Sequence, residues 1–251
     1  MYSIQIKNIP ISNTYMTTKR SIRLPNKLIV MKNKDKAFHE TWTTSSGRQC
    51  NALNLPHPFR ALCLGKPNVG KGVVIKNLIL RQKPYFEEIY CIHPDGRYTE
   101  EWKDVDAIML SDIPPPDQFE GKVKTLVILD DLELQNLGRE QSAYLDRLYG
   151  YCSTHKNISV ICANQDFFSI PSIIRRCSNL FVLWKSHDLD SMNFIAKKVG
   201  LTKEEFRYLF RHFINKKRDS LWIDLTDNTP YPLRKNGFTL IERTENNNFD
   251  L

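Results

Sequence analysis

The sequence predicts an α/β fold in which a mostly parallel sheet carries helices on both faces. Apolar runs of strand length alternate with segments of helical spacing between residues 59 and 225. The run 124–129 is almost entirely apolar, which is typical of a parallel strand covered on both sides. The run 59–64 ends in a glycine-rich turn that leads directly into a helical segment. Such alternation specifies β-α-β units with right-handed crossovers.

The expected elements are bounded by turn residues and prolines. Strands are expected at 4–11, 27–31, 59–64, 88–93, 107–110, 124–129, 158–163, 179–184, 220–225 and 238–243. Helices are expected at 71–81, 100–103, 140–154, 171–177, 189–199 and 203–215. Helix 71–81 has apolar residues at core spacing, and Pro84 follows its end. The turn Pro94-Asp95-Gly96 follows strand 88–93, and Pro114-Pro115-Pro116 is expected to form a rigid surface linker.

The composition indicates a globular protein with one main domain. The chain has 251 residues, of which 41% are hydrophobic and 25% are charged. No apolar run is long enough to span a membrane and the first residues have no signal-peptide pattern, so we expect neither membrane insertion nor secretion. The six cysteines lack the paired spacing of metal ligands, and we expect buried, reduced thiols.

The positive charge is concentrated at the N-terminus. Residues 1–60 contain ten Lys or Arg and two Asp or Glu, a balance of +8 that equals the net charge of the whole chain. We therefore expect a basic arm or cap at 1–55, a core domain at 56–226, and a C-terminal strand and flexible tail at 227–251. A basic extension favours a polyanionic partner such as DNA or RNA, or an acidic protein surface. A merely solubilising extension is the alternative.

The glycine-rich turn has the layout of a phosphate-binding loop. Gly65, four residues, and Gly70-Lys71 stand between the strand 59–64 and the helix 71–81. The loop N–H groups, the positive end of the helix and the Lys71 ammonium would together bind a nucleoside triphosphate. The expected contacts come from Gly65, Lys66, Pro67, Asn68, Val69, Gly70, Lys71, Gly72 and Val73. The loop departs from the pattern at Gly72, where a Ser or Thr normally holds magnesium.

Candidate ligand-binding residues follow four of the expected strands: Gly65, Asp95, Asp130-Asp131 and Gln165. The carboxyl ends of parallel strands meet at one edge of a sheet, where ligands bind. Asp130 would hold Mg²⁺ directly or through water. Because Gly72 has no hydroxyl, Asp130 and water are expected to supply more of the metal ligands than usual. Asp131 would orient or deprotonate the attacking water, and Gln165 would bond that water or sense the γ-phosphate. The plainer alternatives are an Asp pair that caps a turn and a glutamine in a loop.

The order of these motifs resembles that of viral DNA-packaging ATPases of the FtsK/HerA superfamily, the poxvirus type also carried by giant viruses and virophages. The resemblance covers about residues 58–225 and includes the segments Ser153–Ile161 and Ile174–Asn179. It implies a P-loop NTPase fold of the additional-strand type, with ATP and Mg²⁺ as cofactors. It also implies a hexameric or pentameric ring that moves double-stranded DNA into a capsid, in the host cytoplasm or the virion. A capsid or portal-vertex protein is a further candidate partner.

One departure from the family pattern concerns catalysis between subunits. The family has Gly-Arg-His before the strand that ends in the sensor glutamine, whereas this chain has Ser153-Thr154-His155. If the ring uses a basic residue in trans, we expect Arg147 or Lys156 to supply it, ahead of Arg175 and Arg176. Each of these is otherwise a solvated surface charge.

Three other functions are compatible with the loop. A P-loop nucleoside or nucleotide kinase would need an acceptor pocket and an arginine-rich lid, and no lid is evident in the sequence. A DNA-translocating ATPase that does not package genomes would have the same core. A degenerate ATP-binding protein that hydrolyses poorly would be compatible with the departures at Gly72 and Thr154.

Overall fold

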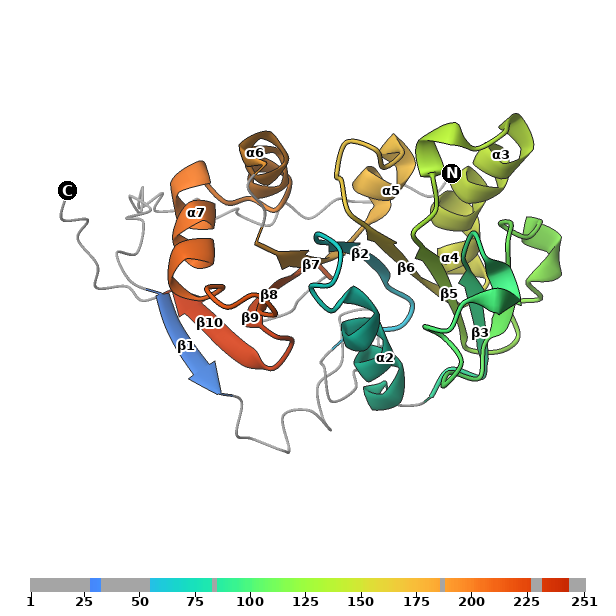
Figure 1. Cartoon of the computed structure of the whole chain (residues 1–251), viewed down its shortest axis with the longest axis horizontal. Coiled ribbons are helices and arrows are strands. Elements are labelled where there is room, and N and C mark those ends of the chain that lie inside the picture. The colour runs from blue at the N-terminus through green and yellow to red at the C-terminus, as the bar shows by residue number, and fades with distance from the viewer. Residues whose placement is uncertain (1–27, 33–54, 83–84, 186–187, 227–231, 244–251) are drawn as a thin grey trace, which may run out of the picture.

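A computed structural model describes residues 28–32, 55–82, 85–185, 188–226 and 232–243 (Figure 1). Within these residues the strands form one ten-stranded sheet in the order β1-β10-β9-β8-β7-β2-β6-β5-β3-β4. The strands are β1 (Leu28–Lys32), β2 (Arg60–Leu64), β3 (Glu88–Ile92), β4 (Ile108–Leu110), β5 (Thr125–Asp130), β6 (Ile158–Asn164), β7 (Leu180–Trp184), β8 (Ser220–Asp224), β9 (Leu233–Lys235) and β10 (Thr239–Arg243).

One half of the sheet is parallel and follows the predicted architecture. Strands β7, β2, β6, β5, β3 and β4 pair in parallel, so their carboxyl ends meet at one edge. Strand β6 lies between β2, which precedes the glycine-rich turn, and β5, which ends in Asp130. An inserted strand at this place is the additional strand that the resemblance implies, and the predicted fold class is confirmed.

The other half of the sheet is antiparallel. Strand β8 pairs antiparallel with β7, and β9, β10 and β1 follow in the same manner. The sheet therefore continues past residue 226 and includes a strand close to the one expected at 27–31. The expected strand at 4–11 lies outside the described residues, as does most of the basic arm.

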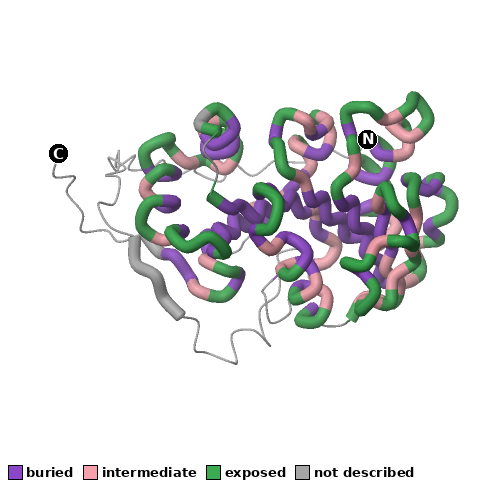
Figure 2. The backbone as a smooth tube through the Cα atoms, in the orientation of Figure 1, coloured by how far each residue is buried: buried purple, intermediate pink, exposed green. Residues whose placement is uncertain are grey.

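Helices cover the two faces unequally (Figure 1). Helix α2 (Lys71–Arg81) packs on one face. The opposite face carries α3 (Arg139–Arg147), α5 (Ser172–Cys177), α6 (Leu189–Lys198) and α7 (Lys203–His212). Successive residues of β2 alternate between the two cores, as the strand period requires: Ala61 and Cys63 face α2, and Leu62 and Leu64 face the other helices. The central strands are consequently buried along their length (Figure 2).

Two expected helices differ from those observed. The helix expected at 140–154 is interrupted after α3 by a π-helical turn, Leu148–Cys152, before the short α4 (Ser153–His155). Gly150, which has low helix propensity, lies within that turn. The helix expected at 100–103 is wrong, because these residues form a bend and turns instead. There Trp102 is buried in the core, which fixes the segment by tertiary contact.

The described cysteines behave as the sequence predicts. Cys63, Cys91, Cys152 and Cys162 are buried free thiols, and Cys177 is a partly buried one. Burial raises the pKa of Cys63 to about 12, so this thiol stays protonated near neutral pH. Among the described helices, none has the length and apolar character needed to cross a bilayer.

Candidate functional site

The turn after β2 is shaped by backbone conformations that few residues adopt. Asn68 and Gly70 have positive φ angles of 59° and 102°. A side chain at Gly65 would begin 2.8 Å from Val69 Cγ2 and 3.1 Å from the Trp184 side chain, so only glycine fits there. Gly70 caps α2 without a side-chain hydrogen bond, and the first turn of the helix contains no acidic residue. The helix therefore presents N–H groups and its positive end to an anion.

Lys71 is held within this turn. Its side chain is largely buried, with 9% of the residue exposed. Its Nζ donates to the carbonyl oxygens of Gly65, at 2.9 Å, and Lys66, at 3.3 Å. The ammonium is thus fixed beside the N-terminus of α2, where two sources of positive potential add.

A cavity of about 480 Å³ lies against the turn and collects residues from five segments of the chain. Its lining consists of Pro67, Asn68, Val69, Gly70, Lys71, Gly72, Val73, Val74, Glu101, Asp130, Asp131, Gln165 and Arg218. Seven of the nine predicted loop residues are in this lining. The other two, Gly65 and Lys66, line a neighbouring cavity. Lys71, Asp130, Asp131 and Gln165 are therefore brought together at one edge of the sheet.

Asp130 is a buried carboxylate without a cationic partner among the described residues. It is 4% exposed, and its Oδ2 accepts a hydrogen bond of 2.9 Å from Trp102 Nε1. Burial raises the pKa of Asp130 to about 6, Asp131 and Glu101 add to this effect, and the Trp102 bond opposes it. The structure thus keeps a negative charge in the cavity at a cost in stability, which is typical of a functional site.

Asp131 and Gln165 are placed by the chain that carries them. Asp131 has a φ of 49°, so the chain turns sharply after β5 and leaves this carboxylate exposed in the cavity lining. The Asn164 side chain organises the loop after β6. Its Oδ1 accepts from the N–H groups of Gln165, at 2.6 Å, and Asp166, at 3.1 Å. Sequence reasoning missed Asn164, which fixes the backbone from which Gln165 projects.

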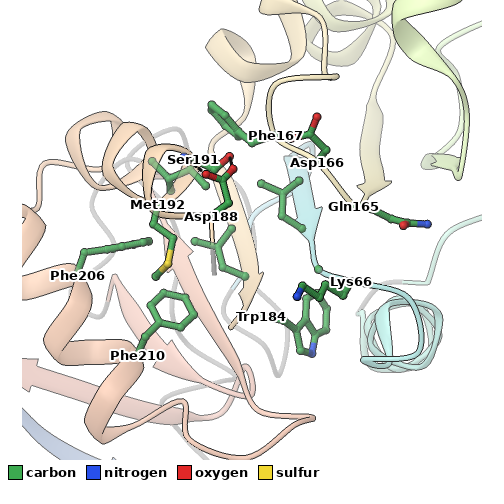
Figure 3. A pocket seen from close by; sticks show the side chains of 14 residues that line it. Lys66, Gln165, Asp166, Phe167, Trp184, Asp188, Ser191, Met192, Phe206 and Phe210 are labelled. Atoms are coloured by element: carbon green, nitrogen blue, oxygen red, sulfur yellow. Dashed lines mark hydrogen bonds between the residues drawn. The ribbon is translucent and has the colours of Figure 1, made fainter. Parts of the chain in front are cut away.

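A second cavity of about 360 Å³ lies on the other side of Gly65 and Lys66 (Figure 3). It is mostly apolar, and its walls include Met192, Phe206 and Phe210 from α6 and α7. Gln165 belongs to both cavity linings, and in Figure 3 its side chain extends away from Met192 and Phe210. The residue therefore stands between the glycine-rich turn and the helical layer.

The geometry can be compared with that of known proteins. No protein-family model matches the chain, and no curated protein matches it in sequence. The genome-packaging NTPase B204 from Sulfolobus turreted icosahedral virus 2, in complex with AMPPCP, matches with a TM-score of 0.51 at 14% identity, over 71% of this chain and 96% of that one. The chain has a fold similar to that of a viral genome-packaging NTPase.

Other structures of that NTPase give the same result. Its complex with sulfate matches with a TM-score of 0.51 at 14% identity, over 77% of this chain and 100% of that one. Its complex with AMP matches with a TM-score of 0.51 at 15% identity. The resemblance predicted from the order of the motifs is thus confirmed for the fold, and the matches span nearly the whole of the B204 chain.

The predicted trans-acting residues lie outside the cavity lining. Arg147 is exposed at the end of α3, and its guanidinium has no hydrogen bond or ion pair within the described residues. Lys156 lies before β6 at the opposite edge of the sheet, where its Nζ donates to the carbonyls of Pro116, at 2.7 Å, and Phe119, at 2.6 Å. Arg175 stacks over the Phe167 and Phe194 rings. A role in a neighbouring subunit stays a prediction for each of them.

Two charged residues of the cavity were missed by sequence reasoning. Glu101 belongs to the turns between β3 and β4, and Arg218 to the turn between α7 and β8. Arg218 is exposed and has no ion pair within the described residues. Neither residue is part of a motif, so only the folded arrangement identifies them. Asp95, by contrast, follows β3 as expected but is absent from the described lining.

Proposed function

We propose that the protein is an ATP-hydrolysing motor that moves double-stranded DNA into a viral capsid. The observation that carries the proposal is the convergence of Lys71, Asp130, Asp131 and Gln165 on one cavity beside the phosphate-binding turn. A fold similar to that of a genome-packaging NTPase supports the same function. ATP is the proposed substrate, and the active form is proposed to be a ring of five or six copies.

Each residue of the cavity has its own role in the proposed hydrolysis of ATP. The turn and the α2 N-terminus bind the phosphates, and Lys71 exchanges its two carbonyl partners for phosphate oxygens. Asp131 orients a water against the γ-phosphorus and takes its proton as the bond to the β-phosphate oxygen breaks. Gln165 bonds that water, and its place beside the second cavity links the site to α6 and α7. Mg²⁺ held at Asp130 would neutralise phosphate charge.

DNA would be gripped through its phosphates. The basic segment 1–60 supplies the charge that such binding needs, although most of it lies outside the described residues. Binding of this kind depends on counterion release and weakens as salt rises. The same segment is also the part proposed to contact a capsid or portal-vertex protein.

The test is ATP hydrolysis with and without duplex DNA, on full-length protein sized by light scattering. We expect stimulation by DNA that declines with salt and is abolished by Lys71→Ala and by Asp131→Asn. Lys122→Ala and Asp117→Asn, two exposed changes outside the cavity, should retain it. A nucleotide-binding oligomer that duplex DNA does not stimulate would contradict the motor, and phosphorylation of an added nucleoside would indicate a kinase.

A further inference from the structure

Gly72 lacks the side-chain hydroxyl that usually binds the metal in a phosphate-binding loop. A Ser or Thr after the loop lysine normally contributes a hydroxyl to the metal that accompanies the triphosphate, and here the residue is Gly72. Val73 and Val74 follow, so no hydroxyl is supplied by the next residues either. The missing oxygen ligand must therefore be dispensable or come from another part of the chain.

The structure places a carboxylate where that side chain would be. A Cβ built on Gly72 would lie 1.9 Å from Glu101 Oε1 and 3.0 Å from Glu101 Cδ. No side chain fits at position 72 while Glu101 keeps this position, because such a contact is far inside the van der Waals limit. The two residues are therefore coupled: the glycine creates the space, and the glutamate oxygen occupies it.

The residues that follow Glu101 are held by contacts to β5 and to α2. Trp102, which is 1% exposed, donates to Asp130 Oδ2 at the end of β5. Asp104 pairs with Lys76 on α2. Glu100 pairs with Lys103, so both acidic neighbours of this segment have a basic partner. Within the described residues, no Lys or Arg pairs with Glu101. The Glu101 carboxylate remains available to a ligand of the cavity.

We infer that Glu101 replaces the loop hydroxyl as the second protein ligand of Mg²⁺, beside Asp130. This inference rests on the proposed nucleotide-binding function. Mg²⁺ binds hard oxygen ligands and usually takes one or two carboxylates together with phosphate oxygens and water. The described residues contain no group of three His, Cys, Asp or Glu side chains that could hold a metal, so phosphate oxygens and water would have to supply the remaining ligands. The site is completed by the triphosphate.

The test measures how strongly the metal and the nucleotide favour each other. The affinity of the full-length protein for AMPPCP is determined with Mn²⁺ and in EDTA. The ratio of the two affinities measures the coupling between metal binding and nucleotide binding. Glu101→Gln should reduce this ratio about 10- to 100-fold, a range typical of changes around a metal, and leave the affinity in EDTA undiminished. Glu100→Gln is the matched control and should retain the ratio of the wild type.

A swap of the two residues makes the test sharper. Gly72→Ser alone should weaken AMPPCP binding, because the Glu101 carboxylate must leave its position to make room for the new side chain. Gly72→Ser combined with Glu101→Ala removes the collision and supplies the hydroxyl, so it should recover most of the Mn²⁺-dependent ratio. The inference is overturned if Glu101→Gln keeps the full ratio or if the swap recovers none of it. Failure of the wild type to bind AMPPCP at all would instead overturn the proposed function.

Discussion

Two buried aspartates at opposite edges of the sheet show how differently the same side chain is used. Asp224 ends β8 beside Leu180, the first residue of β7, and is 1% exposed. Its Oδ2 accepts from Arg234 Nη2 at 2.7 Å, and its Oδ1 accepts from the Thr226 backbone at 3.0 Å. Asp130 ends β5 at the carboxyl edge, is 4% exposed, and has only the Trp102 bond among the described residues.

The difference separates a carboxylate whose charge is balanced by an ion pair from one that has no ion pair within the described residues. Burial raises the pKa of Asp224 as well, but the Arg234 guanidinium and the Thr226 hydrogen bonds oppose this shift, so the buried charge is paired and hydrogen-bonded. Asp130 has no ion pair within the described residues, and the charges of Asp131 and Glu101 raise its pKa further, opposed by the Trp102 bond and by His93. The carboxyl edge thus retains an unbalanced charge that a ligand can neutralise, whereas the opposite edge is neutralised within the fold.

The largest effect on the free energy of unfolding should follow from breaking the buried ion pair between Asp224 and Arg234. Asp224→Asn keeps the shape of the side chain but leaves the Arg234 guanidinium buried beside a neutral amide, and it should lower the free energy of unfolding by about 3–5 kcal/mol. Urea denaturation followed by circular dichroism measures this. Asp219→Asn, at a more peripheral pair with Lys235, is the control and should cost less. Equal costs would show that burial of the pair does not matter.

The same substitution at Asp130 should raise the free energy of unfolding instead of lowering it. Asp130→Asn removes an unpaired buried charge, keeps an acceptor for Trp102, and should raise the free energy of unfolding by about 1–3 kcal/mol in EDTA at pH 7. Because the pKa of Asp130 is raised to about 6, the wild type itself gains stability as the pH falls from 6 toward 4. The difference between the two proteins should therefore shrink at pH 4. A destabilised variant at pH 7 would show instead that the Asp130 carboxylate stabilises the fold.

Lys156 lies at the same edge of the sheet as Asp224, and its substitution tests whether it contributes to stability or to ATP hydrolysis. Lys156→Ala removes two hydrogen bonds to carbonyls and should lower the free energy of unfolding by about 1 kcal/mol, with ATP hydrolysis per folded molecule retained. Steady-state kcat with duplex DNA, corrected for folded fraction, measures this. Arg147→Ala serves as the comparison, since its unpaired guanidinium is the better candidate for a trans-acting residue. Loss of kcat by Lys156→Ala at unchanged stability would instead assign that role to Lys156.

The smallest effect on stability is expected at Arg218. This exposed arginine lines the cavity without a partner among the described residues, so Arg218→Ala should leave the free energy of unfolding unchanged within about 0.5 kcal/mol. The affinity for AMPPCP should fall severalfold, because a cation near the phosphates is lost. Fluorescence titration of the full-length protein measures this. Unchanged affinity would mean that the guanidinium points to solvent rather than to the nucleotide.

The local motifs were predictable because their physics is local. The turn from Gly65 to Lys71 and the strand that ends in Asp130-Asp131 depend on residues that are neighbours in the chain. The alternation of strands and helices predicted the parallel half of the sheet, and the apolar runs located its strands to within one or two residues. The π-helical turn after α3 was not predictable from spacing, because it differs from an α-helix only in its hydrogen-bond register.

By itself the sequence determined that a glycine-rich turn, an acidic strand end and a polar residue after the next strand share one edge of a parallel sheet. The tertiary structure alone decided what else reaches that edge. Glu101 and Arg218 come from turns distant in the chain, and Asp130 remains without a cation while Asp224 acquires Arg234. The reason is that hydrogen-bond spacing fixes strands and helices locally, whereas the pairing of charges depends on which strands become neighbours, a property of the whole chain.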